Sequence, residues 1–149
     1  MALAPITFEI KGLKELEREL LQLPDKIARR SLARAAAAGA RIVRDKAREN
    51  ARAIGLVDSG ALVKSIRIKK VRTRNWRTTQ IYGIGHSGKA WYGRLYEYGF
   101  KEPVGERRHR PHVRPALDEN AEQVANAVKS RLEMEIMKIQ AHGIARAKR

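Results

Sequence analysis

The pattern of apolar and polar residues changes from a strand period to a helix period near the start of the chain. Strict alternation over Thr7–Lys11 predicts a half-buried strand. After Gly12, leucines recur every three or four residues, which predicts an amphipathic helix that ends at Pro24. The leucines of this stripe are Leu13, Leu16, Leu20 and Leu23.

A long Ala-rich helix is predicted over Asp25–Ile54, where Asp25 can cap the start of the helix. One face carries an apolar stripe of mostly small residues, which allows another backbone to approach closely. The stripe consists of Ala28, Leu32, Ala36, Ala40, Val43, Ala47, Ala51 and Ile54.

The opposite side of this helix carries a line of arginines. Arg30, Arg34 and Arg44 have no acidic residue three or four positions away, where helical ion pairs form. A solvated helix face explains most such lines of charge. The three arginines are also candidates for a second basic face that meets a partner.

Two strands joined by a short polar link are predicted next. Ile66 and Ile68 alternate with basic residues, and Thr78–Ile84 is rich in Thr, Ile and Tyr, which indicates an antiparallel hairpin. Its tip combines cations with a Trp, as in surfaces that follow a phosphate backbone and stack on a base. The same cations could instead keep an edge strand soluble. The candidate contacts for nucleic acid or an acidic partner are Lys69, Lys70, Arg72, Arg74, Trp76 and Arg77.

The segment Ala90–Leu117 is the most distinctive part of the sequence. Five of the eight aromatic residues lie within ten positions of it, next to a Gly. Aromatic residues beside Gly and Pro typically form a fixed packing corner, and a contact surface for a partner is the alternative. The candidates for the core or for a subunit seam are Trp91, Tyr92, Leu95, Tyr96 and Tyr98. A basic loop follows, and its further candidate contacts are Arg107, Arg108 and Arg110.

A closing helix is predicted from about Pro115 to Gly143, with an apolar stripe along its length. The stripe consists of Leu117, Ala121, Val124, Val128, Leu132, Ile136 and Ile139. We therefore expect an α+β fold. A small antiparallel sheet of about three strands, including the basic hairpin, packs with the Ala-rich and C-terminal helices. Residues 1–142 form one domain, and residues 143–149 form a basic tail.

Motifs for catalysis and metal binding are weak. Gly83–Lys89 matches the glycine spacing of a phosphate-binding loop, but Ala90 stands where that loop needs Ser or Thr for Mg²⁺. His86 and His142 are isolated, and His109 with His112 lacks further metal ligands. The chain has no Cys, and no paired carboxylates or Ser/His/Asp arrangement stand out. We expect no cofactor, no metal and no enzymatic activity.

The net charge of +16 is concentrated in the middle of the chain. Residues 61–115 carry 14 Lys and Arg against three acids. Such a field attracts polyanions, that is, nucleic acid, an acidic protein surface or an anionic membrane. No apolar stretch approaches the ~20 residues of a membrane span, and we expect a soluble protein made in the cytoplasm.

Several motifs in order resemble a family of phage proteins. The pieces "FEIKGLKELERELLQLP", "DSGALVKSI", "WYGRLYEYG" and "RPHVRPAL" are similar to the siphophage tail-component family. This family comprises the neck or tail-completion proteins of HK-type and lambda-like phages, similar in role to the lambda Z protein. The resemblance extends to about Leu132, although the loop at residues 101–109 is unusually basic. It implies a virion protein that forms a ring, commonly of six copies, at the head–tail junction.

The resemblance also implies the partners. Neighbouring subunits, the head connector and the tail terminator or tail tube would surround the ring, and its lumen would hold DNA or the tape-measure protein. A non-specific DNA-binding protein is the alternative, for which charge is the main argument. An enzyme, a phosphotransferase or nuclease, is the third hypothesis and depends on the glycine-rich loop.

Overall fold

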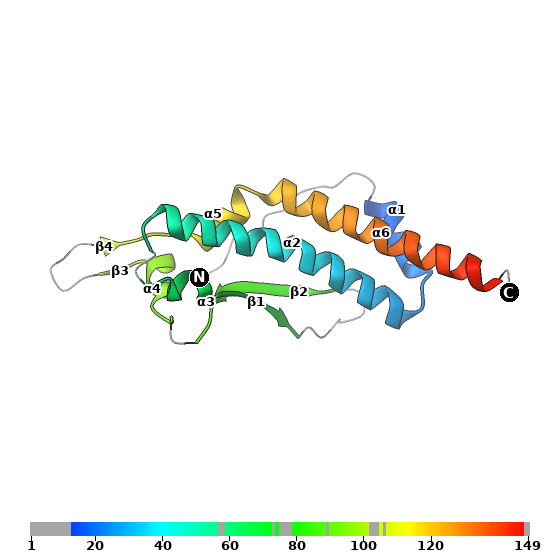
Figure 1. The fold of residues 1–149 in the computed structure, drawn as a ribbon, viewed down its shortest axis with the longest axis horizontal. Coiled ribbons are helices and arrows are strands. Elements are labelled where there is room, and N and C mark those ends of the chain that lie inside the picture. Colours follow the sequence, from blue (N-terminus) through cyan, green and yellow to red (C-terminus); the bar gives the residue numbers. More distant parts are fainter. Residues whose placement is uncertain are drawn as a thin grey trace. The chain divides into compact units, whose positions relative to one another are not determined.

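The computed structural model describes residues 13–56, 59–72, 74, 79–88, 90–101, 105 and 107–147. Contacts divide the chain into two compact units, which are described separately below. Unit 1 comprises Met1–Gly39, Arg72–Ile81 and Glu122–Arg149, and unit 2 comprises Ala40–Val71 and Tyr82–Ala121. The elements are α1 (Leu13–Leu21), α2 (Asp25–Ala53), α3 (Ala61–Ser65), β1 (Ile66–Val71), β2 (Ile81–His86), α4 (Gly93–Tyr98), β3 (Phe100–Lys101), β4 (Arg107–Arg108), α5 (Val113–Asp118) and α6 (Ala121–Ala147) (Figure 1).

Unit 1 has a core formed by three helices. Its buried residues are Leu16 of α1, Ala35 of α2, and Leu132 and Ile136 of α6. Leu20, Leu23 and Val128 are partly buried against this core. The predicted amphipathic helix is therefore confirmed, and its leucine face packs against two other helices.

The helices α2 and α6 approach closely at Gly39. A Cβ atom at this position would lie 2.7 Å from Val128 Cγ2, closer than real Cβ contacts allow. The buried residues of this part of α2 are Ser31, Ala35 and Gly39, spaced by four. Ala28, Leu32 and Ala36 of the predicted apolar stripe are half-buried, so the most buried line of this half of the helix is displaced to one side of the predicted stripe.

In unit 2, the second half of α2 follows the predicted stripe. Ala40, Val43, Ala47 and Ala51 are all buried. The helix ends at Ala53, and Gly55 shortly after it has a φ of 77°, in the left-handed region. Leu56 N–H donates to Ala51 O at 2.9 Å and Gly55 N–H donates to Arg52 O at 3.0 Å, as in a Schellman motif.

The predicted basic hairpin is present. The strands β1 and β2 form a two-stranded sheet, and their arrows run in opposite directions in Figure 1. A second pair of strands was not predicted. Here β3 and β4 are antiparallel, with Phe100 opposite Arg108 and Lys101 opposite Arg107. Each of these strands has two residues, too few to show a periodicity in the sequence.

The aromatic segment contains a short helix, α4, which is followed by Gly99 with a φ of 80°. The closing helix differs from its prediction at both ends. It is divided into α5 and α6 at Glu119 and Asn120, where the Asn120 side-chain amide donates to Ala116 O at 3.0 Å. It also continues through Gly143, because glycine in an exposed helix costs only about 1 kcal/mol relative to alanine.

These elements confirm the α+β class. The predicted strand Thr7–Lys11 lies outside the described residues, so the described sheets are two pairs of strands. Within the described part of the chain, no helix has the length and apolar character needed to cross a bilayer.

Candidate functional site

Basic residues of unit 2 lie on the exposed side of β1. Ile66 is fully buried and Ile68 is half-buried, whereas Arg67 and Lys69 between and after them are exposed. This alternation follows from the strand period of two, which sends successive side chains to opposite faces. Lys70, at the far end of the strand on the face of Ile66, is exposed as well. Of the tip residues predicted as contacts, Trp76 and Arg77 lie outside the described residues.

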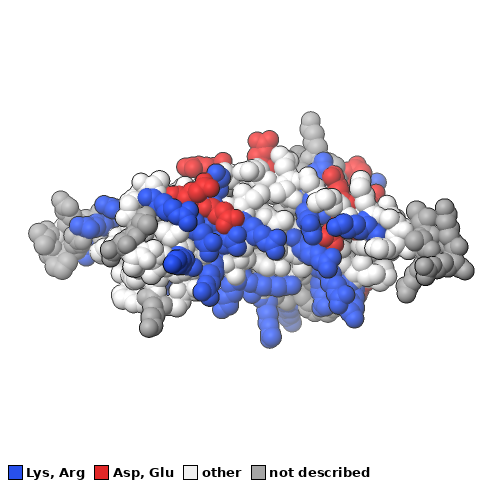
Figure 2. Space-filling view, in the orientation of Figure 1, with Lys and Arg blue, Asp and Glu red and all other residues white. Residues whose placement is uncertain are grey.

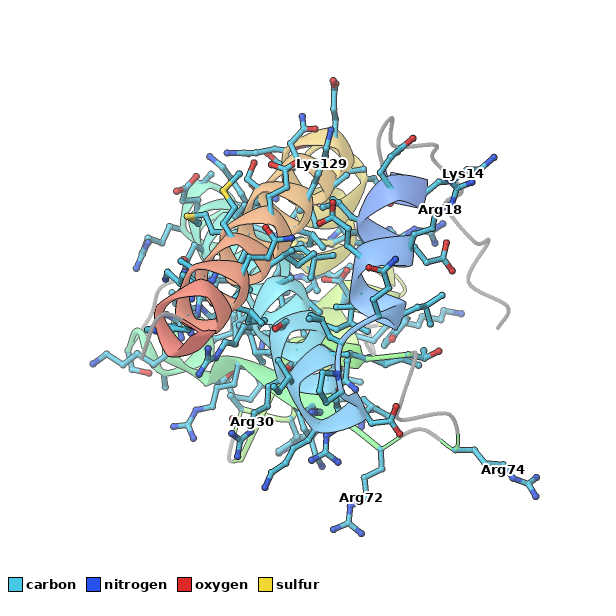
Figure 3. All side chains as sticks on the ribbon, turned by 90° about the vertical axis from the view of Figure 1, so that its right-hand side faces the viewer. Lys14, Arg18, Arg30, Arg72, Arg74 and Lys129 are labelled. Carbon is cyan, nitrogen blue, oxygen red and sulfur yellow. The ribbon has the colours of Figure 1, made fainter. Side chains whose placement is uncertain are left out.

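Unit 1 contains three exposed arginines from the predicted contact sets. Arg30 extends from α2, and Arg72 and Arg74 follow β1 in sequence. Figure 3 shows all three in the lower half of the view, where Arg72 points downwards and Arg74 extends to the right. On the face shown in Figure 2, Lys and Arg cover much more surface than Asp and Glu.

Arg34 and Arg44, the other candidates for a second basic face, have acidic partners. Arg34 Nη1 lies 2.7 Å from Oε2 of Glu135 on α6. Arg131 Nη2 lies 2.8 Å from Oε1 of the same carboxylate, which is almost entirely buried. The hydrogen bond from Arg34 lowers the pKa of Glu135, and burial opposes this shift. Arg44 Nε donates to Asp45 Oδ1 at 2.8 Å, a neighbour that a search at helical spacings of three and four overlooks.

The basic loop is partly anchored to unit 2. Arg110 N–H donates to Tyr96 O at 2.9 Å, and its Nη1 donates to Ile54 O at 3.3 Å. Arg108 is exposed, and for Arg107 the structure describes the backbone only. The anchored Arg110 is therefore less free to follow a partner than the exposed residues of β1.

The aromatic segment is not a closed core. Trp91, Leu95 and Tyr98 are 65 %, 38 % and 60 % exposed. Tyr92 and Tyr96 are half-buried, and the Tyr96 ring packs edge-on against Phe100 with centroids 5.5 Å apart. The core interpretation is wrong for the three exposed residues, and the subunit seam stays a prediction.

A buried polar cluster, which we call the His–Glu cluster, consists of Ser65, His86, Glu97 and His112. The Nε2 atoms of His86 and His112 lie 2.8 Å apart, and His86 Nδ1 lies 2.9 Å from Ser65 Oγ. His112 is fully buried. The prediction that His86 is isolated was wrong, because its partner lies 26 residues further along the chain.

Glu97 joins two of the motifs that carry the family resemblance. Its Oε2 accepts hydrogen bonds from the backbone N–H groups of His112 and Val113, at 2.9 and 3.0 Å. Its Oε1 accepts one from Arg114 N–H at 2.8 Å. The carboxylate of "WYGRLYEYG" therefore holds the backbone of "RPHVRPAL". Burial opposes ionisation, but these three donors and the His112 charge outweigh it and lower the pKa of Glu97.

The hydrogen bonds also determine the protonation of the two Nδ1 atoms. Ser65 Oγ donates to Leu62 O at 2.6 Å, so His86 Nδ1 must donate to Ser65 Oγ. His112 Nδ1 lies 3.0 Å from Arg110 O and 3.3 Å from Glu97 Oε2, both acceptors, so it also carries a proton.

The 2.8 Å between the two Nε2 atoms is a hydrogen-bonding distance, so the two rings contact each other directly. Burial and the neighbouring His112 lower the pKa of His86 to about 4.

The His–Glu cluster explains a glycine of the aromatic motif. A Cβ atom at Gly93 would lie 2.6 Å from three atoms of the His86 ring. Among the described residues, no group of three or more His, Cys, Asp or Glu is arranged to hold a metal ion. The cluster has its acceptors and donors internally paired, as a structural polar network does.

Comparison with protein families gives a match at residues 14–99, more than half of the 149-residue chain. The matching family model is described as "Bacteriophage HK97-gp10, putative tail-component". No curated protein and no solved structure is significantly similar to the chain. The matched residues include β1, β2 and α4 with Glu97, and they end before His112.

Proposed function

We propose, from the premise that this chain belongs to the HK97-gp10-like family of phage tail components, that it is the tail-completion or neck subunit of a tailed phage. The family match is the observation that carries this proposal. Membership makes the protein a structural component of the virion. The finer assignment places it in a ring at the head–tail junction.

An exposed aromatic surface supports assembly. Leu95 and Tyr98 are three residues apart on α4, and Trp91 comes two residues before that helix. Large apolar side chains gathered on a surface typically mark a contact with another protein. A neighbouring subunit of the same ring would cover them, and six copies are the expected number.

The basic excess supports a position next to DNA. In a ring, each exposed cation of one subunit is repeated in every copy, so a net charge of +16 per chain creates a strong positive field. The expected neighbours are the head connector and the tail terminator or tail tube. Genomic DNA or the tape-measure protein occupies the lumen in this arrangement.

A catalytic role has no support in this proposal. The family is one of structural tail components. Gly83 and Gly85, which gave the glycine-rich loop its motif, lie within β2 rather than in a loop before a helix. A phosphate-binding loop needs the latter arrangement.

The test uses the purified protein alone and mixed with phage tails that lack it. We expect rings in negative-stain images, a mass several times that of one chain, and added density at the head-proximal end of the tails. Tails that stay unchanged, together with a monomeric mass at micromolar concentration, would refute the neck assignment.

A non-specific DNA-binding protein is the second candidate, favoured by the exposed cations of β1 and by the net charge. This protein would coat DNA with little sequence preference and would leave tails unchanged. The same mixing experiment therefore separates the two functions.

A further inference from the structure

The outer face of the β1–β2 sheet combines two cations with two glycines. The glycines are Gly83 and Gly85 of β2. At Gly83, a Cβ atom would lie 3.8 Å from both Lys69 O and Val71 Cγ2. Val71 therefore shares a face with Gly83, and the strand period of two places Lys69 and Arg67 on that face as well.

Neither glycine is required by the fold. Gly83 and Gly85 have no positive φ, unlike Gly88, which follows the strand. The contacts of 3.8 Å at Gly83 are ordinary, and nothing lies within 4 Å of a Cβ at Gly85. By contrast, Gly39 and Gly93 have neighbours under 3 Å that exclude any side chain.

A glycine inside a strand destabilises it by roughly 0.5–1 kcal/mol relative to alanine. Two such residues two positions apart leave the face flat and its backbone uncovered. Glycines of this kind often mark places where a ligand or another backbone approaches closely. The space that the fold leaves open at Gly85 is therefore available to a partner.

The charge of this face identifies the kind of partner. Arg67 and Lys69 are exposed, and neither has an ion pair with any described residue. A guanidinium beside an ammonium binds phosphate oxygens well, because Arg supplies a planar pair of donors and Lys a compact charge.

An acidic protein carries its charge on flexible side chains, which can reach Arg67 and Lys69 even if a side chain stands between. A phosphodiester chain carries its charge on its backbone, so it has to approach the strand closely. The two glycines therefore favour the phosphodiester chain.

We propose that the outer face of the β1–β2 sheet binds the phosphodiester backbone of nucleic acid, with Arg67 and Lys69 as the cations and Gly83 and Gly85 as the surface of closest approach. This inference deepens the proposed function by assigning the polyanion contact to one face of unit 2. It concerns the single subunit and does not depend on the number of copies in a ring.

The charge part is tested by the double variant Arg67→Gln/Lys69→Gln, titrated with a short DNA duplex and with oligothymidine at several salt concentrations. Losing two phosphate contacts should lower affinity about tenfold and reduce the salt slope by about two for duplex DNA. The control Lys14→Gln/Arg18→Gln removes the same charge from exposed positions on α1 of unit 1. Equal losses in the two double variants would overturn the assignment to this face.

The glycine part is tested by Gly85→Val. Because the site is open and valine favours strands, the variant should melt at or above the wild-type temperature. Its affinity for DNA should still fall by about threefold or more, because the valine side chain occupies the space that the phosphodiester backbone needs. A Gly85→Val protein that binds DNA as tightly as the wild type contradicts the close approach.

The probes separate the possible sources of negative charge. Preference for either the duplex or the single strand over polyglutamate supports a phosphodiester ligand. Polyglutamate that binds equally well, with an equal loss in Gly85→Val, would overturn it in favour of an acidic protein.

Tail capping by Arg67→Gln/Lys69→Gln is scored separately from DNA binding. Intact capping with lost DNA binding supports both proposals. Wild-type protein that never caps tails refutes only the neck assignment.

Discussion

At the residue scale, the His–Glu cluster is a hydrogen-bonded network inside unit 2. Four side chains from separate segments meet there, and each ring nitrogen faces a donor or an acceptor. A buried network of this kind depends on all of its members, because a group left without its partner loses both hydrogen bonding and solvation. The pH and the space around His86 should therefore both affect stability.

Acid should destabilise the protein through His86. Its pKa of about 4 in the fold lies below the ordinary 6.5, so between these pH values the unfolded chain binds more protons. The free energy of unfolding should rise as the pH increases from about 4 to 6.5, and this contribution should be complete above 6.5. Chemical denaturation across this range measures the slope.

Replacing His86 with Gln should flatten that slope, while the exposed control His142→Gln should keep it. The lowered pKa values of Glu97 and Glu135 act in the same direction, but only near and below their ordinary value of 4.5. A His86→Gln protein with the full wild-type slope between about pH 5 and 6.5 would show that another group is responsible.

Substituting Gly93 should disturb the His–Glu cluster directly. In Gly93→Ala the new methyl group overlaps the His86 ring, so the ring or the backbone of α4 must shift. We expect a loss of about 1–3 kcal/mol in the free energy of unfolding, typical of overpacking. The nitrogen chemical shifts of both imidazole rings should also change.

The matched control is Gly85→Ala, the same chemical change at an open position, which should leave stability and the imidazole signals nearly unaltered. If the two alanine variants have equal stability, the contact between Gly93 and His86 is not tight in solution.

At the element scale, periodicity predicted the helices and the hairpin, but it did not predict where they pack. The leucine stripe of α1 and the apolar stripe in the second half of α2 face inwards as predicted, because each is a local pattern of hydropathy. The buried line Ser31, Ala35 and Gly39 depends instead on how closely α6 approaches, which is a long-range property.

The residue pairs of the candidate site could not be predicted either, because their members are far apart in sequence. The partners of His86 and Arg34 are 26 and 101 residues away in sequence. Exposure along β1 was predictable, because a strand that buries Ile66 must expose Arg67.

The three-helix core of unit 1 should depend strongly on Leu132. This residue is 4 % exposed and packs with Leu16, Ala35 and Ile136. Leu132→Ala should lower the free energy of unfolding by about 2–5 kcal/mol, the range for deleting a buried leucine side chain. Denaturant titration measures the change.

Met137→Ala on the same helix is the control, because Met137 is 66 % exposed. Its effect should stay within about 0.5 kcal/mol. Similar losses in the two variants would mean that α6 is not held by the core around Leu132.

At the scale of the whole molecule, the exposed aromatic surface should determine assembly. Leu95→Glu places a charge among Trp91 and Tyr98 without entering the core, since Leu95 is already exposed. If this surface is the subunit seam, the variant should sediment as a monomer. Each chain should remain folded, because the substitution does not enter the core. Analytical ultracentrifugation measures the mass.

Leu21→Glu makes the same change at an exposed position on α1 and should leave assembly intact. Oligomers of unchanged mass in Leu95→Glu would locate the seam elsewhere.

The ion pair between Arg34 and Glu135 has a kinetic consequence. Its members are separated by 101 residues, so the core that surrounds it has a high contact order. During translation, α1 and the first half of α2 leave the ribosome long before α6, and their inward faces have no partner in that interval. This unit can therefore close only after α6 has been synthesised, which makes its closure a late event.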